Sequence, residues 1–310
     1  MNTDTLEAIK GSAAIPSMPM IATRCYEMTS DPNCNYDRLI KLLETDAGMA
    51  ADVLRHSNSA LFGVTRQVTS LKQAVTLLGL RRIRDLVLSR YLVQKLGDAR
   101  NDLVNIHHFW RRSLACGILT ARFAEAAQVH GRDEAFIAGL LADVGVVILA
   151  RALPRQYGLI TAQYRTANGR QWTDLEFAQL GITHSEVSAM VLEQWNLPAT
   201  IVDAVRRHHD LDAPASQTGN ANKPDIAAII GTAGDVARWL CEPGDPQTAA
   251  QGSIDAMSKV GLDAATLAGA LAAIEGDIKG MARLLGVDVV DTKTFAAVAA
   301  HVNTTATAGV

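Results

Sequence analysis

The sequence lacks the features that mark membrane-spanning, secreted or disulfide-rich proteins. Its four cysteines, Cys25, Cys34, Cys116 and Cys241, are scattered and form no CxxC pair, so we expect four reduced thiols. The N-terminus has no basic segment followed by an apolar one, and no uninterrupted apolar run approaches the roughly 18–20 residues that cross a bilayer. These absences predict a cytoplasmic protein with no membrane partner.

A basic excess, aromatic residues and strand-like alternation are also scarce. The 310 residues carry a net charge of −3, so nucleic-acid binding would need a local patch. Aromatic residues make up 5% of the chain and no stretch alternates with period two, which argues against sheets. Hydrophobic residues reach 48%, which excludes wholesale disorder.

Apolar residues at three- and four-residue spacing run through almost the whole chain, and alanine is abundant. This pattern predicts an all-α protein. We expect an N-terminal helical bundle over residues 1–100, packed on a second helical bundle over 101–240. A C-terminal helical extension over 241–310 should follow a polar linker at 213–222.

Local signals predict several helix ends. Ser70 and Gln73 form a capping box before a helix over 71–78, and Gly79 suits the position just after it. Two further capping boxes pair Thr173 with Glu176 and Thr183 with Glu186, and Pro198 suits the first position of a helix. The remaining predicted helices cover 20–29, 36–44, 48–58, 81–96, 109–128 and 134–150.

Asp143 stands inside the unusually apolar stretch 134–150. A buried carboxylate is costly unless it is paired or bound to a metal ion. It is therefore either a metal ligand or its remnant, or a buried aspartate satisfied by a cap, a histidine or an arginine. No histidine stands beside it, which favours the second interpretation.

The histidines also allow two interpretations. His184 opens one predicted helix and His208-His209 closes the next. Neighbouring residues on a helix point about 100° apart, so we do not expect His208 and His209 to form one chelating pair. A role at the helix C-terminus, where the dipole favours a cation, is as well supported as metal binding. His107 and His108 start a helix, where neutral, exposed rings are expected.

Four arginines, Arg81, Arg82, Arg84 and Arg90, stand on one predicted helix. They form a candidate patch for nucleic acid or a nucleotide phosphate. The neighbouring Asp85 and the exposed-face pattern favour an ordinary solvated surface instead.

Several short motifs together resemble the HDOD family, a relative of the HD-domain phosphohydrolases. Each motif alone is weak, but they occur in the family's order and spacing over roughly residues 14–240. They are PSMP (16–19), HSNSALFG (56–63), SLKQAVTLLGL (70–80), FWRRSL (109–114), AGLLADVG (138–145), HSEV (184–187), WNLP (195–198) and HH (208–209).

The resemblance implies a degenerate metal site. HD phosphohydrolases hold metal ions with a first histidine, a His-Asp pair, further histidines and a late aspartate. Here the first histidine falls on Arg112, the histidine of the pair on Ala142 and the late aspartate on Gly234, with Asp235 one residue away. Arginine, alanine and glycine supply no ligand. Asp143, His184, His208 and His209 do match, and Arg112 could neutralise Asp143.

The resemblance therefore implies a non-catalytic output module of bacterial signal transduction, a regulatory protein of the response-regulator type. We expect no enzyme activity, no metal and no cofactor. The expected partners are other signalling proteins, namely a kinase, a receiver or a transcription factor, and a nucleotide is a candidate ligand. Any ligand-sized cleft should lie between the first segment and the region of Asp143, His184 and His208.

Two alternatives remain open. One is a metal-dependent phosphodiesterase with a reduced ligand set, which predicts stoichiometric metal. The other is a regulator that binds nucleic acid through the helix from Arg81 to Arg90, although nucleic acid is not the expected partner.

Overall fold

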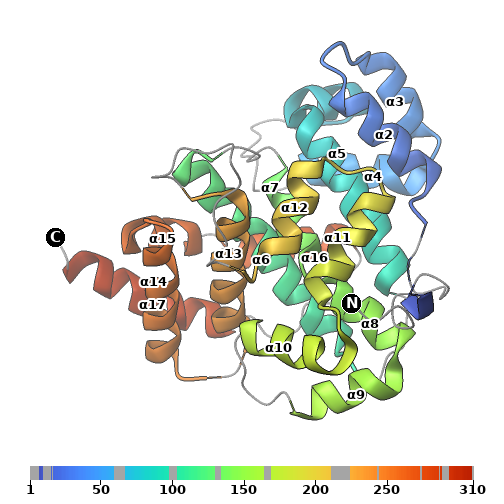
Figure 1. Ribbon diagram of the computed structural model, residues 1–310. Helices are drawn as coiled ribbons and strands as arrows, with labels where there is room; N and C mark the ends of the chain where they lie inside the picture. Colours follow the sequence, from blue (N-terminus) through green and yellow to red (C-terminus); the bar gives the residue numbers. More distant parts are fainter. Residues whose placement is uncertain are drawn as a thin grey trace. The chain divides into compact units, whose positions relative to one another are not determined.

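The computed structural model describes residues 7–9, 15, 17–58, 67–97, 103–129, 134–163, 169–210, 224–242, 244–272, 274–285, 287 and 293–308. In this part of the chain the regular secondary structure is helical and contains no strand (Figure 1). The all-α prediction is confirmed. The helices bury mainly aliphatic side chains and alanines, as their spacing in the sequence predicts.

The chain divides into two compact units. The smaller comprises residues 17–98 and 279–288, and the larger comprises 1–16, 99–278 and 289–310. Most of residues 241–310 belong to the larger unit. α14 (Pro246–Lys259), α15 (Ala264–Leu271) and α17 (Lys293–Ala308) pack on one another within the larger unit, because their apolar faces share one core. α16 (Ile274–Leu285) crosses the division after residue 278.

Four helices build most of the smaller unit, and α5 (Leu71–Gly97) contacts the other three. Gly79 lies inside α5 with φ 77°, a left-handed conformation that glycine adopts without strain. Its backbone splits α5 into the two helices predicted on either side of Gly79. The other three helices are α2 (Met20–Ser30), α3 (Tyr36–Glu44) and α4 (Ala47–Ser57).

The larger unit is built around α6 (Ile106–Ala127), which packs on α7 (Ala135–Leu141) and α13 (Ile226–Cys241). A second group of contacts joins α11 (His184–Gln194) to α8 (Val144–Ala152) and to α12 (Ala199–Arg207). α9 (Pro154–Gln163) and α10 (Gly169–Leu180) pack on each other beside them. This packing brings α6, the turn between α7 and α8, α11 and α12 close together within the larger unit.

The single helix predicted over 134–150 is wrong. A turn at Ala142 and Asp143 separates α7 from α8. Beyond the turn, the Gly145 N–H donates to Ser188 Oγ at 2.8 Å, and a Cβ at Gly145 would lie 2.0 Å from the His184 carbonyl oxygen. α8 therefore leaves the turn in the direction that allows this close approach to α11.

The predicted helix starts differ in outcome. The capping box of Thr183 and Glu186 is confirmed at the start of α11. The box of Thr173 and Glu176 is wrong, because both residues lie inside α10 and Glu176 is buried in the core. Pro198 is the N-cap of α12 and therefore lies one position earlier than predicted.

One stretch, Ala135–Ala152, is long and apolar enough to cross a membrane by length and composition alone. However, 72% of it is buried inside the protein, and the turn at Ala142 and Asp143 interrupts it. Buried core helices satisfy the same test, so the stretch is weak evidence for a membrane span.

Candidate functional site

Four polar side chains converge in the larger unit. Asp143 comes from the turn between α7 and α8, His184 is the first residue of α11, and His208 and His209 follow α12. Asp143 Oδ1 lies 3.4 Å from His184 Nε2, 3.3 Å from His208 Nε2 and 3.9 Å from His209 Nε2. One ligand atom from each of the four residues lies within 4.8 Å of the others. We call these four residues the central cluster.

The tandem histidines do not diverge as expected. α12 ends at Arg207, His208 is its C-cap residue, and the ring centroids of His208 and His209 are 3.9 Å apart. His208 Nδ1 donates to the Val205 carbonyl oxygen at 2.6 Å, which is the predicted helix-end role. The Nε2 atom of the same ring faces Asp143. His208 therefore caps a helix and joins the central cluster.

Glu176 holds His184 of the central cluster in position. The sequence analysis assigned Glu176 to a helix cap and did not predict this role. Its carboxylate has no exposed surface. It accepts hydrogen bonds from Tyr157 Oη at 2.7 Å, Trp172 Nε1 at 2.8 Å, and the backbone N–H and Nδ1 of His184, both at 2.7 Å. These bonds turn His184 Nε2 toward Asp143. The spacing of Trp172 and Glu176 by four residues on one helix face is the sequence signal that could have found this pair.

Arg112, on α6, provides the charge next to Asp143. Its guanidinium lies 3.3 Å from Asp143 Oδ2, while the histidines face Oδ1. Burial raises the pKa of Asp143, but Arg112 and the hydrogen bonds from His184 and His208 outweigh burial and hold this pKa well below its usual value. Asp143 is therefore an ionised carboxylate with both oxygens engaged.

The histidines differ in their protonation. Burial lowers the pKa of His184, but the nearby Glu176 and Asp143 outweigh it and raise the pKa to about 10. Burial and the neighbouring His208 and His184 hold the pKa of His209 well below its usual value. With His184 charged and His209 neutral, the 2.9 Å contact between their Nε2 atoms is a hydrogen bond that His184 donates.

The other positions implied by the resemblance lie on α13 and at the turn. Ala142 is buried beside Asp143. A Cβ at Gly234 would meet no atom within 4 Å, so this position contributes no contact to the site. Of the pair at the start of α6, His107 is exposed as expected, but His108 is half-buried and lies 3.0 Å from Arg111.

The four arginines of the candidate basic patch belong to the smaller unit and do not share one exposed face. Arg81 and Arg82 are exposed. Arg84 is buried, with its guanidinium over the Tyr26 ring, and Arg90 forms an ion pair with the buried Asp52. Arg81 and Arg82 are therefore the exposed members of the candidate patch.

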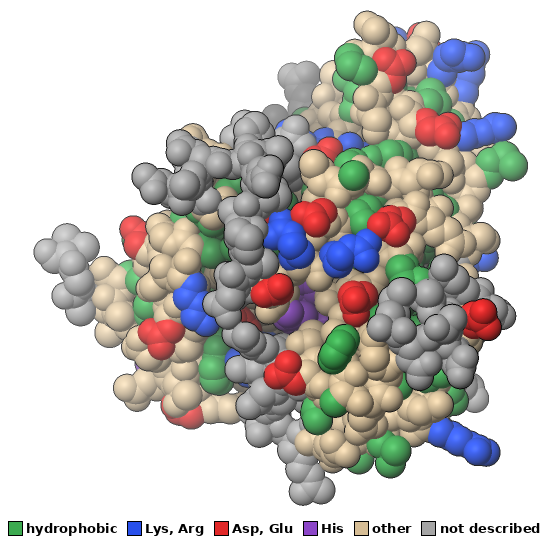
Figure 2. Space-filling model, in the orientation of Figure 1, with side chains coloured by type: hydrophobic (Ala, Val, Ile, Leu, Met, Phe, Trp, Pro, Cys, Tyr) green, Lys and Arg blue, Asp and Glu red, His purple; other side chains and the backbone are tan. Residues whose placement is uncertain are grey.

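A cavity of about 280 Å³ opens beside the central cluster, and all of its lining residues belong to the larger unit. Arg112, Asp143, His184 and His209 form its polar end. In Figure 2 a small area of histidine surface is visible among acidic and basic side chains. The expectation that a cleft also borders the first segment stays a prediction.

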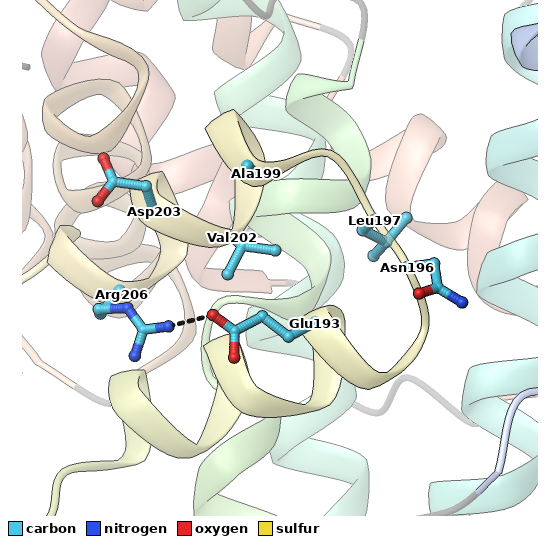
Figure 3. Close-up of a pocket in the computed structure, with 7 residues that line it drawn as sticks. All are labelled: Glu193, Asn196, Leu197, Ala199, Val202, Asp203 and Arg206. Carbon is cyan, nitrogen blue, oxygen red and sulfur yellow. Dashed lines mark hydrogen bonds and ion pairs between the residues drawn. The ribbon is translucent and has the colours of Figure 1, made fainter.

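A second hollow lies between the end of α11 and the start of α12 and measures about 450 Å³ (Figure 3). Leu197 and Val202 lie on its apolar side, and an ion pair between Glu193 and Arg206, 2.6 Å long, lies along its edge. Its lining contains no histidine, whereas four potential ligand side chains converge beside the cavity at the central cluster. The cavity at the central cluster is therefore the better candidate site.

A family model for the HDOD domain matches residues 15–211, which include the whole central cluster. The chain belongs to the HDOD family. An uncharacterised protein of Treponema pallidum (strain Nichols) is 25% identical to this HDOD chain over 201 residues. That match covers 64% of the chain but 38% of the relative, so the chain spans well under half of the relative's length.

Solved structures share the fold. An HDOD protein of unknown function from Geobacter sulfurreducens is 22% identical with a TM-score of 0.70, over 90% of this chain and 96% of that one. A protein of Shewanella amazonensis SB2B, provisionally named a phosphohydrolase, is also 22% identical with a TM-score of 0.70. That match covers 91% of this chain and 98% of the Shewanella chain. A protein of Marinobacter aquaeolei VT8, provisionally named for signal transduction, is 20% identical with a TM-score of 0.60, over 97% and 65%.

The HD relatives of this family imply a metal ion, and the central cluster can be tested for it. Three imidazole Nε2 atoms and one carboxylate oxygen converge at separations close to those of ligands around one transition-metal ion. Glu176 and the Val205 carbonyl hold the far nitrogens of His184 and His208, as outer groups do around metal-bound histidines. The donor set therefore fits one ion, with Arg112 on the other carboxylate oxygen.

Proposed function

We propose that this HDOD domain is a non-catalytic output module that acts by binding in bacterial signal transduction. One observation carries the proposal: the Arg112 guanidinium lies against Asp143 at the position that resembles the first metal-binding histidine. A permanent cation there neutralises the carboxylate without a metal ion. Arginine also cannot become a ligand, because it does not deprotonate.

The losses at the site support the same role. Ala142 and Gly234 carry no donor atom, and both stand where the HD relatives have ligands. A hydrolytic site needs several protein ligands and an activated water. The packing residues that carry the fold are kept, while ligands specific to hydrolysis are missing. This combination supports binding rather than hydrolysis.

We further propose a cytoplasmic location and protein partners, namely a kinase, a receiver or a transcription factor of a response-regulator pathway. The family membership and the signal-transduction name of one structural relative support this assignment. The scattered cysteines support a reducing compartment. Nucleic acid is not proposed as a partner, because Arg84 and Arg90 of the candidate patch are engaged inside the smaller unit.

The test combines metal analysis with affinity purification from one preparation. The full chain is incubated with Mn²⁺, Fe²⁺ and Zn²⁺, desalted, and measured by elemental mass spectrometry and with a chromogenic phosphodiester. The proposal predicts substoichiometric metal, no turnover, and co-purification of a defined signalling protein. Stoichiometric metal together with turnover that Asp143→Ala abolishes would overturn it.

A second candidate function is supported by the convergence of the four donors. Asp143, His184, His208 and His209 would hold one divalent ion, and such an ion supplies Lewis acidity and an activated water for phosphodiester hydrolysis. In this candidate Glu176 orients His184, and Arg112 binds a substrate phosphate oxygen or positions Asp143. The metal measurement above separates the two candidates, and His209→Ala should then lower the bound metal.

A further inference from the structure

The cavity beside the central cluster has two chemically distinct parts. Its volume of about 280 Å³ lies just below the roughly 300–1,000 Å³ that ligand pockets usually enclose. This size suits a molecule of one or two rings with a small substituent. Five apolar side chains line one part, and Arg112 with three members of the central cluster (Asp143, His184 and His209) lines the other.

The apolar part is already held in position. Leu103, Val104, Phe109, Val146 and Trp172 line it. The Trp172 indole donates from Nε1 to Glu176 at 2.8 Å, and the Phe109 ring packs edge-on against Trp110 with centroids 5.0 Å apart. Two aromatic rings that are fixed before binding favour a flat ligand, because little rotamer freedom is lost when it docks.

The charged groups around the polar part pair with each other. Arg112 lies 3.3 Å from Asp143, His184 Nδ1 lies 2.7 Å from Glu176, and Glu242 lies 3.9 Å from Arg238. A ligand that brought its own net charge would therefore enter a half-closed site with no group left to balance it, which is costly. The same atoms offer both hydrogen-bond donors and acceptors to an uncharged polar ring.

We propose that this cavity binds an uncharged, flat heteroaromatic molecule of about nucleoside size, and that it disfavours the phosphorylated form of that molecule. The inference rests on the proposed non-catalytic role, because a bound metal ion would attract a phosphate. The ring lies between Phe109, Trp172 and Val146, and its polar edge faces His209 and Arg112.

The test uses adenosine, guanosine, cytidine and uridine, each beside its 5′-monophosphate, with the full chain in the presence of a chelator. Affinities are measured by isothermal titration calorimetry, and contact is checked by ligand-observed NMR. We expect at least one nucleoside to bind about tenfold more tightly than its monophosphate. Failure of all four nucleosides to bind, or tighter binding of the monophosphates, would overturn the inference.

A pair of matched variants places the ligand in this cavity. Val146→Trp fills the cavity from α8, whereas Leu159→Trp adds the same indole to a side chain of α9 that is 60% exposed and lies outside the lining. We expect Val146→Trp to weaken nucleoside binding at least tenfold and Leu159→Trp to leave it unchanged. Circular dichroism checks that both variants fold. Equal binding by Val146→Trp and the wild type would overturn the assignment.

The two proposals fail in different ways. Release of phosphate from the monophosphates after addition of Mn²⁺ would overturn the non-catalytic role. Lack of nucleoside binding in a preparation that also lacks phosphate release would overturn the ligand assignment and leave the non-catalytic role in place.

Discussion

Each unit of this HDOD domain contains a buried carboxylate, but the two carboxylates have different surroundings. In the smaller unit Asp52 lies between Arg55 and Arg90, whose side chains are 60% and 20% exposed. In the larger unit Glu176 has no exposed surface, and all four of its hydrogen bonds come from buried or half-buried groups. Neither of the two cavities described above is lined by residues 17–98.

The difference shows which buried charges indicate a site. The Asp52 group joins helices of one bundle through flexible arginines, which water can still reach. The Glu176 group fixes an imidazole whose other nitrogen points to a cavity and to three further polar side chains. A buried carboxylate is informative about function when it orients another group toward open space.

The largest expected difference comes from removing each carboxylate. Glu176→Ala leaves Tyr157, Trp172 and His184 without their acceptor in the core, so it should lower the free energy of unfolding by about 3–5 kcal/mol. Asp52→Ala should cost about 1–2 kcal/mol, because its arginines can turn to water. Urea unfolding of both variants measures the difference. Equal losses would break the comparison between the units.

The pH dependence of stability should run in opposite directions for two buried histidines. His184, with a pKa raised to about 10 by Glu176 and Asp143 against burial, contributes stability that is complete below pH 6.5 and lost as the pH rises toward 10. Burial and Arg82 lower the pKa of His56 to about 4, so stability is lost as the pH falls from 6.5 toward 4. Each window should be worth on the order of 1–3 kcal/mol.

Urea midpoints between pH 4 and pH 10, taken in chelator, measure both windows. His184→Gln should flatten the alkaline limb only, and His56→Gln the acidic limb only. An alkaline limb that persists in His184→Gln would assign the lost stability to another group.

Replacing the arginine beside a buried aspartate should change the affinity for Zn²⁺ in the larger unit only. Arg112→His removes a positive charge beside Asp143 and adds an imidazole, so we expect Zn²⁺ to bind about tenfold more tightly or better. Arg90→His is the matched control next to Asp52 in the smaller unit and should have no such effect. Competition with a chromogenic chelator gives both affinities. Unchanged Zn²⁺ affinity in Arg112→His would show that Arg112 does not stand in for a metal ion.

The smallest effects are expected for removing an exposed arginine from an ion pair, one in each unit. Arg206→Ala removes the ion pair with Glu193 at the edge of the second hollow (Figure 3), and Arg55→Ala removes an exposed partner of Asp52. Each should change stability by less than about 0.5 kcal/mol. Thermal unfolding at low and high salt checks this. A larger loss in one variant would mark that pair as part of a wider network.

Local signals predicted most of the helical framework. The bounds of α3, the break at Gly79 and the capping box of α11 all follow from neighbours in the sequence. The prediction failed where distant parts meet. The turn at Asp143 depends on the approach of α8 to α11. Glu176 is held in the core by hydrogen bonds that Tyr157, Trp172 and His184 donate to it.

The candidate site was predictable in its members and not in its geometry. Asp143, His184, His208 and His209 are identifiable from the motifs, and the family resemblance placed Arg112 where it could neutralise Asp143. The convergence of His208 and His209 was not, because both rings face Asp143, which lies more than 60 residues earlier in the sequence.

The contact of Gly145 with the His184 carbonyl has a consequence for how this site can evolve. The spacing between the two chain segments that carry Asp143 and His184 is fixed by main-chain atoms and by the bond from Gly145 to Ser188. Substitutions at Arg112 or Gly234 remove no atom of these contacts. Side chains at these two positions can therefore change while Asp143 and His184 keep their spacing.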